Sequence, residues 1–214
     1  IQDITFRLGY NMHYYVAAQT NVTIKYNGDS SNLKSFPKFT LFGTLLDGIN
    51  YISTQDAVFD IYSGLVNVPV LQCSGSIKTL SLISENNTDS KITLTNLDSN
   101  KRIYFPESMV AQNGVFIEGG SSYSEVTKIL DNTSGWRLSE NLNEEYYGSL
   151  VYKFGYNSFK KLPYIEFPDW IDKTIGDGLT IKYIVCNGQQ GNVSAKIINS
   201  IRDIPDKNDS TKYY

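Results

Sequence analysis

Histidine is almost absent from the sequence. The 214 residues contain one histidine, His13. Hydrolysis by a Ser-His-Asp or Cys-His mechanism would have to use it. It lies in a short segment of polar and aromatic residues before a predicted strand, which does not suggest a catalytic role. A zinc site is equally disfavoured, because one histidine and two distant cysteines do not form a ligand set. We therefore expect no catalytic residues, no metal site and no cofactor.

Cysteine is nearly as scarce, and two residues cannot form a disulfide scaffold. Cys73 and Cys186 each end an apolar run and precede a turn of small or polar residues, Ser74-Gly75 and Asn187-Gly188. This pattern predicts two buried, reduced thiols. A disulfide between neighbouring strands is the alternative.

Strong positive charge and long apolar runs are also missing. The net charge is −3 and the longest basic run is Lys160-Lys161, whereas a nucleic-acid binder needs a basic stripe. No apolar run approaches the roughly 20 residues of a membrane helix. We expect no nucleic-acid partner and no membrane span. The chain begins at Ile1 without a signal pattern, so we expect a fragment of a longer protein.

Carboxylates are present but do not suggest a glycoside-hydrolase pair. Glu144 and Glu145 are adjacent, so they would point to opposite faces of an extended chain. Asp169, Asp172 and Asp177 lie among turn residues, where aspartate is common for backbone reasons. Solvated turns are the preferred interpretation, and no stretch has the alternating acidic ligands of a calcium loop.

Aromatic and turn-forming residues are abundant. The chain has 16 Tyr, 10 Phe and 16 Gly, and this composition favours strands joined by turns. It predicts a mainly β fold, at most a β-rich α+β fold. We expect antiparallel strands and hairpins, an inserted β-rich region and few short helices.

The clearest strand pattern lies in residues 178–197. Alternate apolar residues from Leu179 to Val185 follow a turn at Gly178, as in a half-buried strand. Gly188, Gly191 and Asn192 then predict a hairpin loop leading to a return strand over 193–197. Elsewhere, Asp47-Gly48 predicts a tight hairpin turn, and the spacing of Val22, Ile24 and Tyr26 predicts one face of another strand.

Several motifs together resemble the baseplate J-like family of contractile phage tails. The fullest match is Gly188-Gln-Gln-Gly-Asn-Val193, which follows Gly178-Leu-Thr-Ile-Lys-Tyr183. Further patches are Leu8-Gly9-Tyr10 with the strand after it, and Val68-Pro69-Val70. At Phe167-Pro-Asp-Trp170 the sequence departs from the family, because Pro168 and Trp170 replace glycines.

The resemblance, with the residue pattern, implies a domain organisation. Residues 1–19 are expected to contain the end of an upstream helix and an entry segment. Residues 20–76 and 148–198 would form the baseplate J-like β core, and 77–147 a β-rich insertion. The polar residues 199–214 are interpreted as an exit linker.

The resemblance also implies a structural role as a wedge subunit of a T4-like tail baseplate, in the ring around the tail hub. The expected partners are other baseplate wedge proteins and further copies of the full-length chain. Assembly would take place in the host cytoplasm and the final location would be the virion. The alternative is a carbohydrate-binding β-sandwich module with Trp136 or Trp170 exposed in a groove. A cell-wall hydrolase is a weaker third hypothesis.

Overall fold

The computed structural model describes residues 14–26, 35–44, 49–80, 101–119, 135–145, 147, 149–171, 179–192 and 198–203. Strands make up 53% of the structure and, within the described ranges, no helix reaches seven residues, which confirms the predicted mainly β fold. The helical pieces in the described part are two 3-10 turns, η3 (Leu142–Glu144) and η4 (Gly188–Gly191). His13, the Asp47-Gly48 turn and Gly178 lie outside the described residues.

The chain forms two compact units. Unit 1 contains the described residues within Ile1–Tyr14 and Lys78–Tyr183, and unit 2 contains those within Tyr15–Ile77 and Ile184–Tyr214. The chain therefore enters unit 2 twice, so that both units are assembled from segments far apart in sequence.

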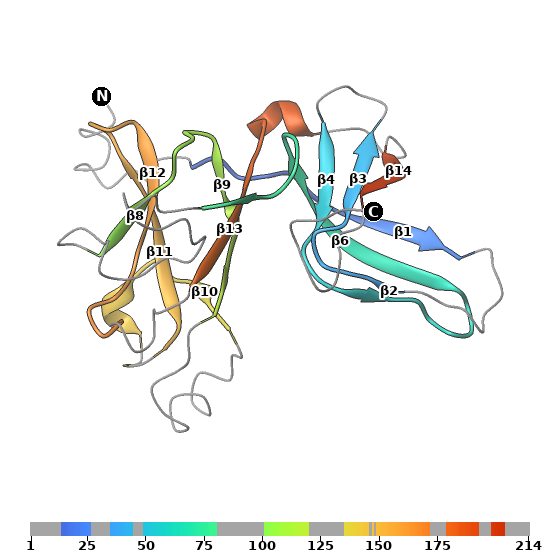
Figure 1. Cartoon of the computed structure of the whole chain (residues 1–214), viewed down its shortest axis with the longest axis horizontal. Coiled ribbons are helices and arrows are strands. Elements are labelled where there is room, and N and C mark those ends of the chain that lie inside the picture. Colours follow the sequence, from blue (N-terminus) through green and yellow to red (C-terminus); the bar gives the residue numbers. More distant parts are fainter. Residues whose placement is uncertain are drawn as a thin grey trace, which may run out of the picture. The chain divides into compact units, whose positions relative to one another are not determined.

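Unit 2 is built on one five-stranded antiparallel sheet with the order β1–β6–β4–β3–β14 (Figure 1). Its strands are β1 (Gln19–Lys25), β3 (Leu41–Thr44), β4 (Asn50–Ser53), β6 (Leu65–Cys73) and β14 (Ile198–Asp203). A two-residue pair, β2 (Ser35–Phe36) with β5 (Ala57–Val58), accompanies it.

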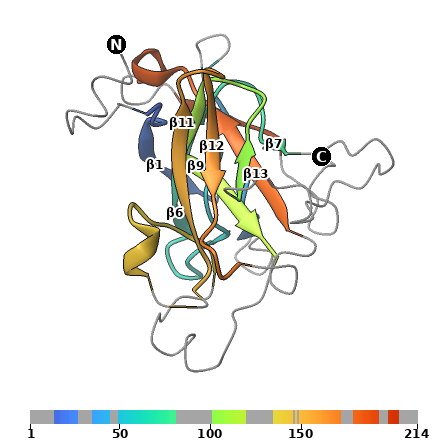
Figure 2. The same ribbon diagram turned by 90° about the vertical axis from the view of Figure 1, so that its left-hand side faces the viewer.

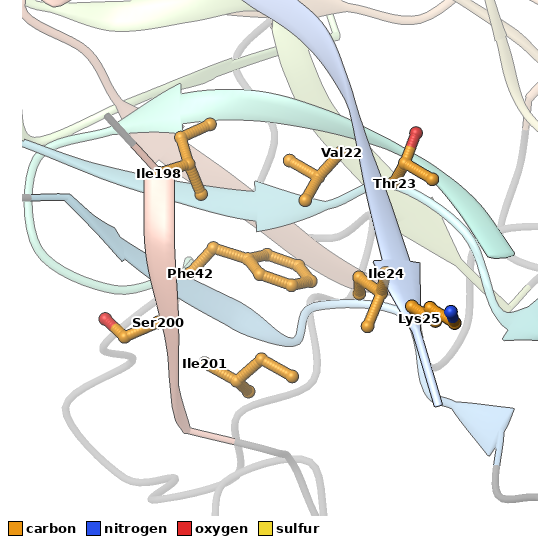
Figure 3. Close-up of a pocket in the computed structure, with 8 residues that line it drawn as sticks. All are labelled: Val22, Thr23, Ile24, Lys25, Phe42, Ile198, Ser200 and Ile201. Carbon is orange, nitrogen blue, oxygen red and sulfur yellow. The ribbon is translucent and has the colours of Figure 1, made fainter. Parts of the chain in front are cut away.

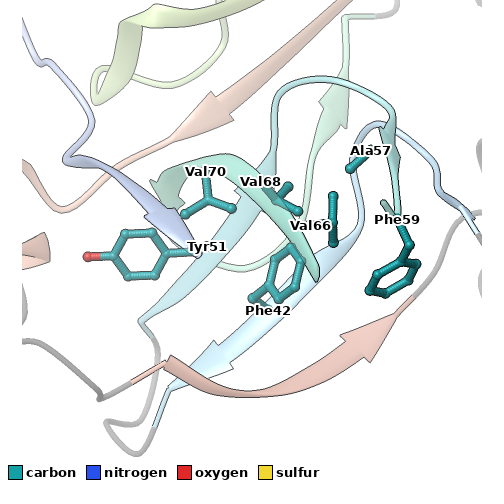
Figure 4. Close-up of a cluster of buried hydrophobic side chains, with 7 residues drawn as sticks. All are labelled: Phe42, Tyr51, Ala57, Phe59, Val66, Val68 and Val70. Atoms are coloured by element: carbon teal, nitrogen blue, oxygen red, sulfur yellow. The ribbon is translucent and has the colours of Figure 1, made fainter. Parts of the chain in front are cut away.

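This sheet curves around a single core. Phe42, Tyr51 and Val68 belong to a buried cluster that Figure 4 shows between the strands. Val22 and Ile24 from edge strand β1 pack against that cluster, as Ile198 from edge strand β14 does. Because both edges of the sheet reach the same core, the sheet has the form of a partly open barrel.

The pairing of β1 with β6 explains two features of the sequence. Val22 and Ile24 are half-buried and their neighbours are exposed, so the predicted face of this strand is confirmed. Proline has no backbone N–H and so cannot donate a hydrogen bond to a neighbouring strand. Pro69 is tolerated within β6 because the pairing of β6 with β4 ends at Ser53 and Val70, so no hydrogen bond between these two strands is lost at Pro69.

Unit 1 contains two sheets. One has the order β10–β11–β12–β8 and the other β7–β13–β9; in Figure 2, β11 and β12 are seen beside one another, as are β9 and β13. The strands are β7 (Lys78–Thr79), β8 (Arg102–Tyr104), β9 (Val110–Glu118), β10 (Arg137–Leu138), β11 (Val151–Asn157), β12 (Leu162–Glu166) and β13 (Thr180–Val185). The last two residues of β13 belong to unit 2.

Aromatic side chains fill the space between the two sheets of unit 1. The ring of Phe105 lies 5.0 Å from that of Tyr183 and 6.1 Å from that of Phe154, measured between centroids. The Tyr152 hydroxyl donates to the carbonyl of Val115 at 3.2 Å, which links β11 to β9. Burial raises the pKa of Tyr152 to about 12. These contacts make unit 1 a β-sandwich with an aromatic core.

The structure differs from the sequence analysis in three places. Unit 1 runs on to Tyr183, so β11 and β12 pair with β8 rather than with the strands of residues 20–76. The first residues of the predicted exit linker form β14, whose polar side chains suit an edge strand. The pair β10–β11 is parallel over two residues, a pairing that the sequence analysis did not predict.

Candidate interaction surfaces

The predicted turn glycines form a structural element of unit 2. Gly188 has φ +55°, a conformation that favours glycine, and begins η4 rather than a simple hairpin loop. Gly191 lies so close to Gln72 that an added Cβ would be 2.4 Å from its Oε1. The carbonyl of Gly191 accepts a hydrogen bond from the Tyr51 hydroxyl at 2.9 Å. Asn192 is exposed and the predicted return strand over 193–197 lies outside the described residues.

Gln72 completes this element, and sequence reasoning did not single it out. Its side chain is fully buried and its Oε1 accepts from the backbone N–H of Asn187 at 2.9 Å. The only signal in the sequence was a polar residue directly before Cys73, after the apolar pair Val70-Leu71. Both cysteines are buried and unpaired with each other, and burial raises the pKa of Cys73 to about 12.

Of the carboxylates considered for catalysis, the structure describes Glu144, Glu145 and Asp169. Glu145 pairs with Arg137, whose guanidinium Nη1 donates to Oε1 at 2.9 Å and holds the pKa of Glu145 below its usual value. Glu144 accepts from Asn141 at 2.6 Å, and Asp169 is exposed. Asp172 and Asp177 lie outside the described residues. Within the described ranges, no three His, Cys, Asp or Glu side chains gather in a way that could hold a metal ion.

The two tryptophans, both in unit 1, are half-buried and anchored. The indole N–H of Trp136 donates to the carbonyl of Gly119 at 2.8 Å, and its ring packs against Phe167 at 5.3 Å. The indole N–H of Trp170 donates to the carbonyl of Ser149 at 3.2 Å, and its ring lies 5.8 Å from that of Tyr147. These contacts assign both rings to the packing of unit 1.

The most exposed apolar group in the described part of unit 2 lies at the turn between β5 and β6. We call residues 58–65 the apolar tip. Within it, Val58, Ile61 and Tyr62 leave 74%, 63% and 91% of their surface in solvent and Leu65 leaves 41%, whereas Phe59 is buried. The sequence analysis did not identify this surface.

Hydrogen bonds fix the apolar tip. The Asp60 carboxylate accepts from the backbone N–H groups of Tyr62 and Ser63, at 3.1 and 2.7 Å, and from the Ser63 hydroxyl. The Ser63 bonds hold the pKa of Asp60 below its usual value. Gly64, at φ +64°, closes the turn, and its carbonyl accepts from the N–H of Tyr26. The apolar side chains are therefore presented on an ordered turn.

Unit 1 has a comparable turn between β11 and β12. Phe159 at this turn is 90% exposed, and the Asn157 side chain accepts from the N–H groups of Phe159 and Lys160 at 3.0 Å each. Here the neighbours are basic: Lys160 lies over the Tyr104 ring at 3.9 Å. A single exposed aromatic ring beside a lysine is a smaller apolar surface than the apolar tip.

The outer face of β8 and β12 is polar and aromatic. The Tyr104 and Tyr164 rings lie 5.5 Å apart. Arg102 lies over the Tyr164 ring and donates to Glu166 at 2.6 Å. Since cations already cover these rings, the face is not an open stacking platform.

Comparisons with known proteins do not name a family. No family model matches the sequence, and a search of curated proteins finds no match. In the described part of the chain, no helix has the length and apolar character needed to cross a membrane.

Proposed function

We propose that this chain is a structural subunit that works by binding other proteins, and that it serves as a wedge subunit in the baseplate of a contractile phage tail. The observation that carries the proposal is the apolar tip. Ile61 and Tyr62 are strongly exposed on a turn that Asp60 and Gly64 hold in place. Exposed apolar groups of this kind mark interaction sites.

The energetics favour burial of the tip in a protein interface. Removing one such side chain from water contributes about 1.5–3 kcal/mol, and tyrosine is enriched among the residues that dominate binding energy. The turn is already ordered, so binding costs less conformational entropy than ordering a flexible loop. A rigid apolar tip therefore suits a lasting assembly contact.

The baseplate assignment depends on the family resemblance. In unit 2 the turn that contains the matching glycines, Gly188 and Gly191, is held against the sheet by hydrogen bonds of Tyr51 and Gln72. A motif used for packing agrees with a structural role. The partners would be other baseplate wedge proteins and a second copy of the full-length chain, assembled in the host cytoplasm and carried into the virion.

Co-expression tests the proposal. The chain would be produced with candidate wedge proteins and analysed by size-exclusion chromatography with light scattering. We expect a stable complex, and we expect the double variant Ile61→Ser, Tyr62→Ser to lose it while remaining folded. Phe159→Ser is the matched control, because it removes an equally exposed ring from unit 1. Equal complex formation by the wild type and the double variant would contradict the proposal.

Carbohydrate binding is the second candidate, supported by one observation. Tyr147 exposes 65% of its surface beside Trp170, with ring centroids 5.8 Å apart. Such a pair could stack on a sugar. A glycan array separates the two functions: binding that is lost in Tyr147→Ala would favour carbohydrate recognition over protein assembly.

A further inference from the structure

An apolar groove runs between the two edge strands of unit 2. It has a volume of about 420 Å³ and is lined by Val22, Thr23, Ile24, Lys25, Phe42, Ile198, Ser200 and Ile201. Figure 3 shows side chains from β1 and β14 on opposite sides of the Phe42 ring. The groove is the seam of the partly open barrel.

The strand directions explain why this seam stays open. Each neighbouring pair in the sheet is antiparallel, so β1 and β14, at positions one and five, run in the same direction. An up-and-down antiparallel barrel cannot close with an odd number of strands. One more strand, antiparallel to both edges, would complete a closed sheet of six.

The backbone of β1 presents free hydrogen-bonding groups to the seam. Gln72 N–H donates to the Ala18 carbonyl and Tyr26 N–H to the Gly64 carbonyl, both at 2.8 Å. Because bonded pairs alternate along an antiparallel ladder, the even-numbered residues of β1 bond to β6. The N–H and carbonyl groups of Asn21, Thr23 and Lys25 therefore face the open edge.

The side chains of the groove specify what kind of strand would fit. Val22 and Ile24 on one side and Ile198 and Ile201 on the other require apolar side chains at alternate positions of the occupant. Among the described residues that line the groove, Lys25 is the only charged one. It ends β1, so it would lie beside the amino-terminal end of a strand that runs antiparallel to β1.

We propose that the seam binds an extended segment of a partner protein, which adds as a sixth strand between β1 and β14. The segment has alternating apolar residues and an acidic residue at its amino-terminal end. Main-chain hydrogen bonds to Thr23 and its odd-numbered neighbours supply binding, and the apolar pockets supply specificity, as in other cases of strand addition. The inference deepens the proposed structural role.

The probe is a carboxyl-terminally fluorescein-labelled peptide, acetyl-Glu-Val-Thr-Ile-Thr-Val-Thr, added to the complete chain. Fluorescence anisotropy measures binding. Two control peptides share its composition: one carries the glutamate at the other end, and one is N-methylated at both central threonines, whose N–H groups would face β1. We expect reversal of the glutamate to weaken binding about two- to five-fold, and N-methylation to abolish it.

Amide hydrogen exchange gives a second readout that needs no variant. In the free chain the N–H groups of Val22 and Ile24 should be protected, and those of Asn21, Thr23 and Lys25 should exchange rapidly. At a peptide concentration ten times Kd, exchange at the three odd-numbered residues should slow about ten-fold. An apolar ligand lying in the groove without main-chain bonds would not produce this alternation.

Two substitutions of Thr23 distinguish the contribution of its backbone N–H to peptide binding from that of its side chain. Thr23→Pro removes the outward N–H and is compatible with an edge strand. Thr23→Val removes only the hydroxyl, which donates to Asn67 Oδ1 at 2.6 Å. We expect Thr23→Pro to weaken peptide binding about five-fold or more and Thr23→Val to change it less than two-fold.

The inference is overturned if the folded chain leaves the anisotropy of the peptide unchanged, or if the N-methylated peptide binds as tightly as the parent. Either result leaves the apolar tip untouched, because residues 58–65 do not line the groove. Failure of strand addition and failure of the proposed assembly role are therefore distinguishable.

Discussion

The two units treat their apolar surface differently. Unit 1 covers most of it internally, because its two sheets face each other across Phe105, Phe154 and Tyr183. Unit 2 curves one sheet around its core and leaves the seam beside Phe42 and the apolar tip exposed. In the described residues, unit 1 therefore encloses its aromatic core between two sheets, whereas unit 2 leaves apolar surface exposed, and it is this surface that we propose binds other chains.

Unit 1 also carries ion pairs. The ion pairs Lys78–Glu107, Arg102–Glu166 and Lys182–Glu118, at 2.6, 2.6 and 3.0 Å, all belong to unit 1. Each contributes little to stability where it is exposed.

Natural probes allow the units to be followed separately. Trp136 and Trp170 lie in unit 1, whereas Cys73 and Cys186 lie in unit 2. Tryptophan fluorescence therefore reports on unit 1, and the rate of thiol modification reports on unit 2. The predictions below use this separation.

The largest effect is expected from the aromatic core of unit 1. Phe105→Ala removes a fully buried ring between two others and should cost about 3–5 kcal/mol of unfolding free energy. The loss of unfolding free energy in Phe42→Ala should be near the lower end of that range, because Phe42 already borders the groove. Urea unfolding followed by circular dichroism measures both. A larger loss for Phe42→Ala would reverse the comparison.

The next effect concerns thiol chemistry in unit 2. Burial raises the pKa of Cys73 from 9.0 to about 12, so its thiolate fraction at pH 8 should fall about a thousand-fold. Iodoacetamide should modify Cys73 in the native chain at least a hundred-fold more slowly than in urea, as read by mass spectrometry. Native modification within ten-fold of the denatured rate would show that unit 2 does not bury this thiol.

Two glycines with equally close neighbours should differ in effect. An added Cβ would lie 2.4 Å from Gln72 Oε1 at Gly191 and 2.3 Å from Tyr164 Cζ at Gly155. Gln72 is buried and bonded to Asn187, so Gly191→Ala should cost about 1–3 kcal/mol. The half-exposed Tyr164 ring can swing outward, so Gly155→Ala should cost less than about 1 kcal/mol. Denaturation midpoints test this, and equal losses would contradict it.

The smallest effect is a pH dependence in unit 1. Desolvation would raise the pKa of Glu107, but hydrogen bonds from Lys78 and Tyr183 outweigh it and lower the pKa below 4.5. The lowered pKa contributes stability above pH 4.5, which is lost as the pH falls through the folded-state value. Glu107→Gln should remove this pH dependence, which should change the free energy of unfolding by less than about 1 kcal/mol.

A substitution of the hydrogen-bonding partner of Glu107 provides the control for Glu107→Gln. Lys78 donates to Glu107 at 2.6 Å, so Lys78→Met should also flatten the dependence of unfolding free energy on pH between 5 and 3. Tryptophan fluorescence in urea measures it. An unchanged slope in both variants would mean that these bonds do not stabilise unit 1.

Local patterns predicted the strands that have one buried face. The spacing of Val22 and Ile24 identified a face of β1, and the run from Val66 to Cys73 identified β6. Both predictions follow directly from the alternation of apolar and other residues along a strand. Ile181 and Tyr183 were predicted as buried, but Lys182 between them is buried as well, because its ammonium group pairs with Glu118.

Other features depend on contacts between distant segments. β14 has polar residues because it is an edge strand, so its sequence looked like a linker. The Gly188–Gly191 turn is held by Gln72 and Tyr51, which are more than 100 residues away along the chain. The apolar tip was not identified, because the hydrogen bonds of the Asp60 carboxylate that turn the chain after β5 leave no clear signal in the sequence.

The central claim is that unit 2 carries the contacts to other proteins. Hydrogen exchange of the chain, free and in complex with a co-expressed wedge protein, tests it most directly. The account predicts that new protection appears in the apolar tip and at the odd-numbered amides of β1, while unit 1 changes little. New protection confined to unit 1, with the tip and β1 unchanged in a stable complex, would contradict it.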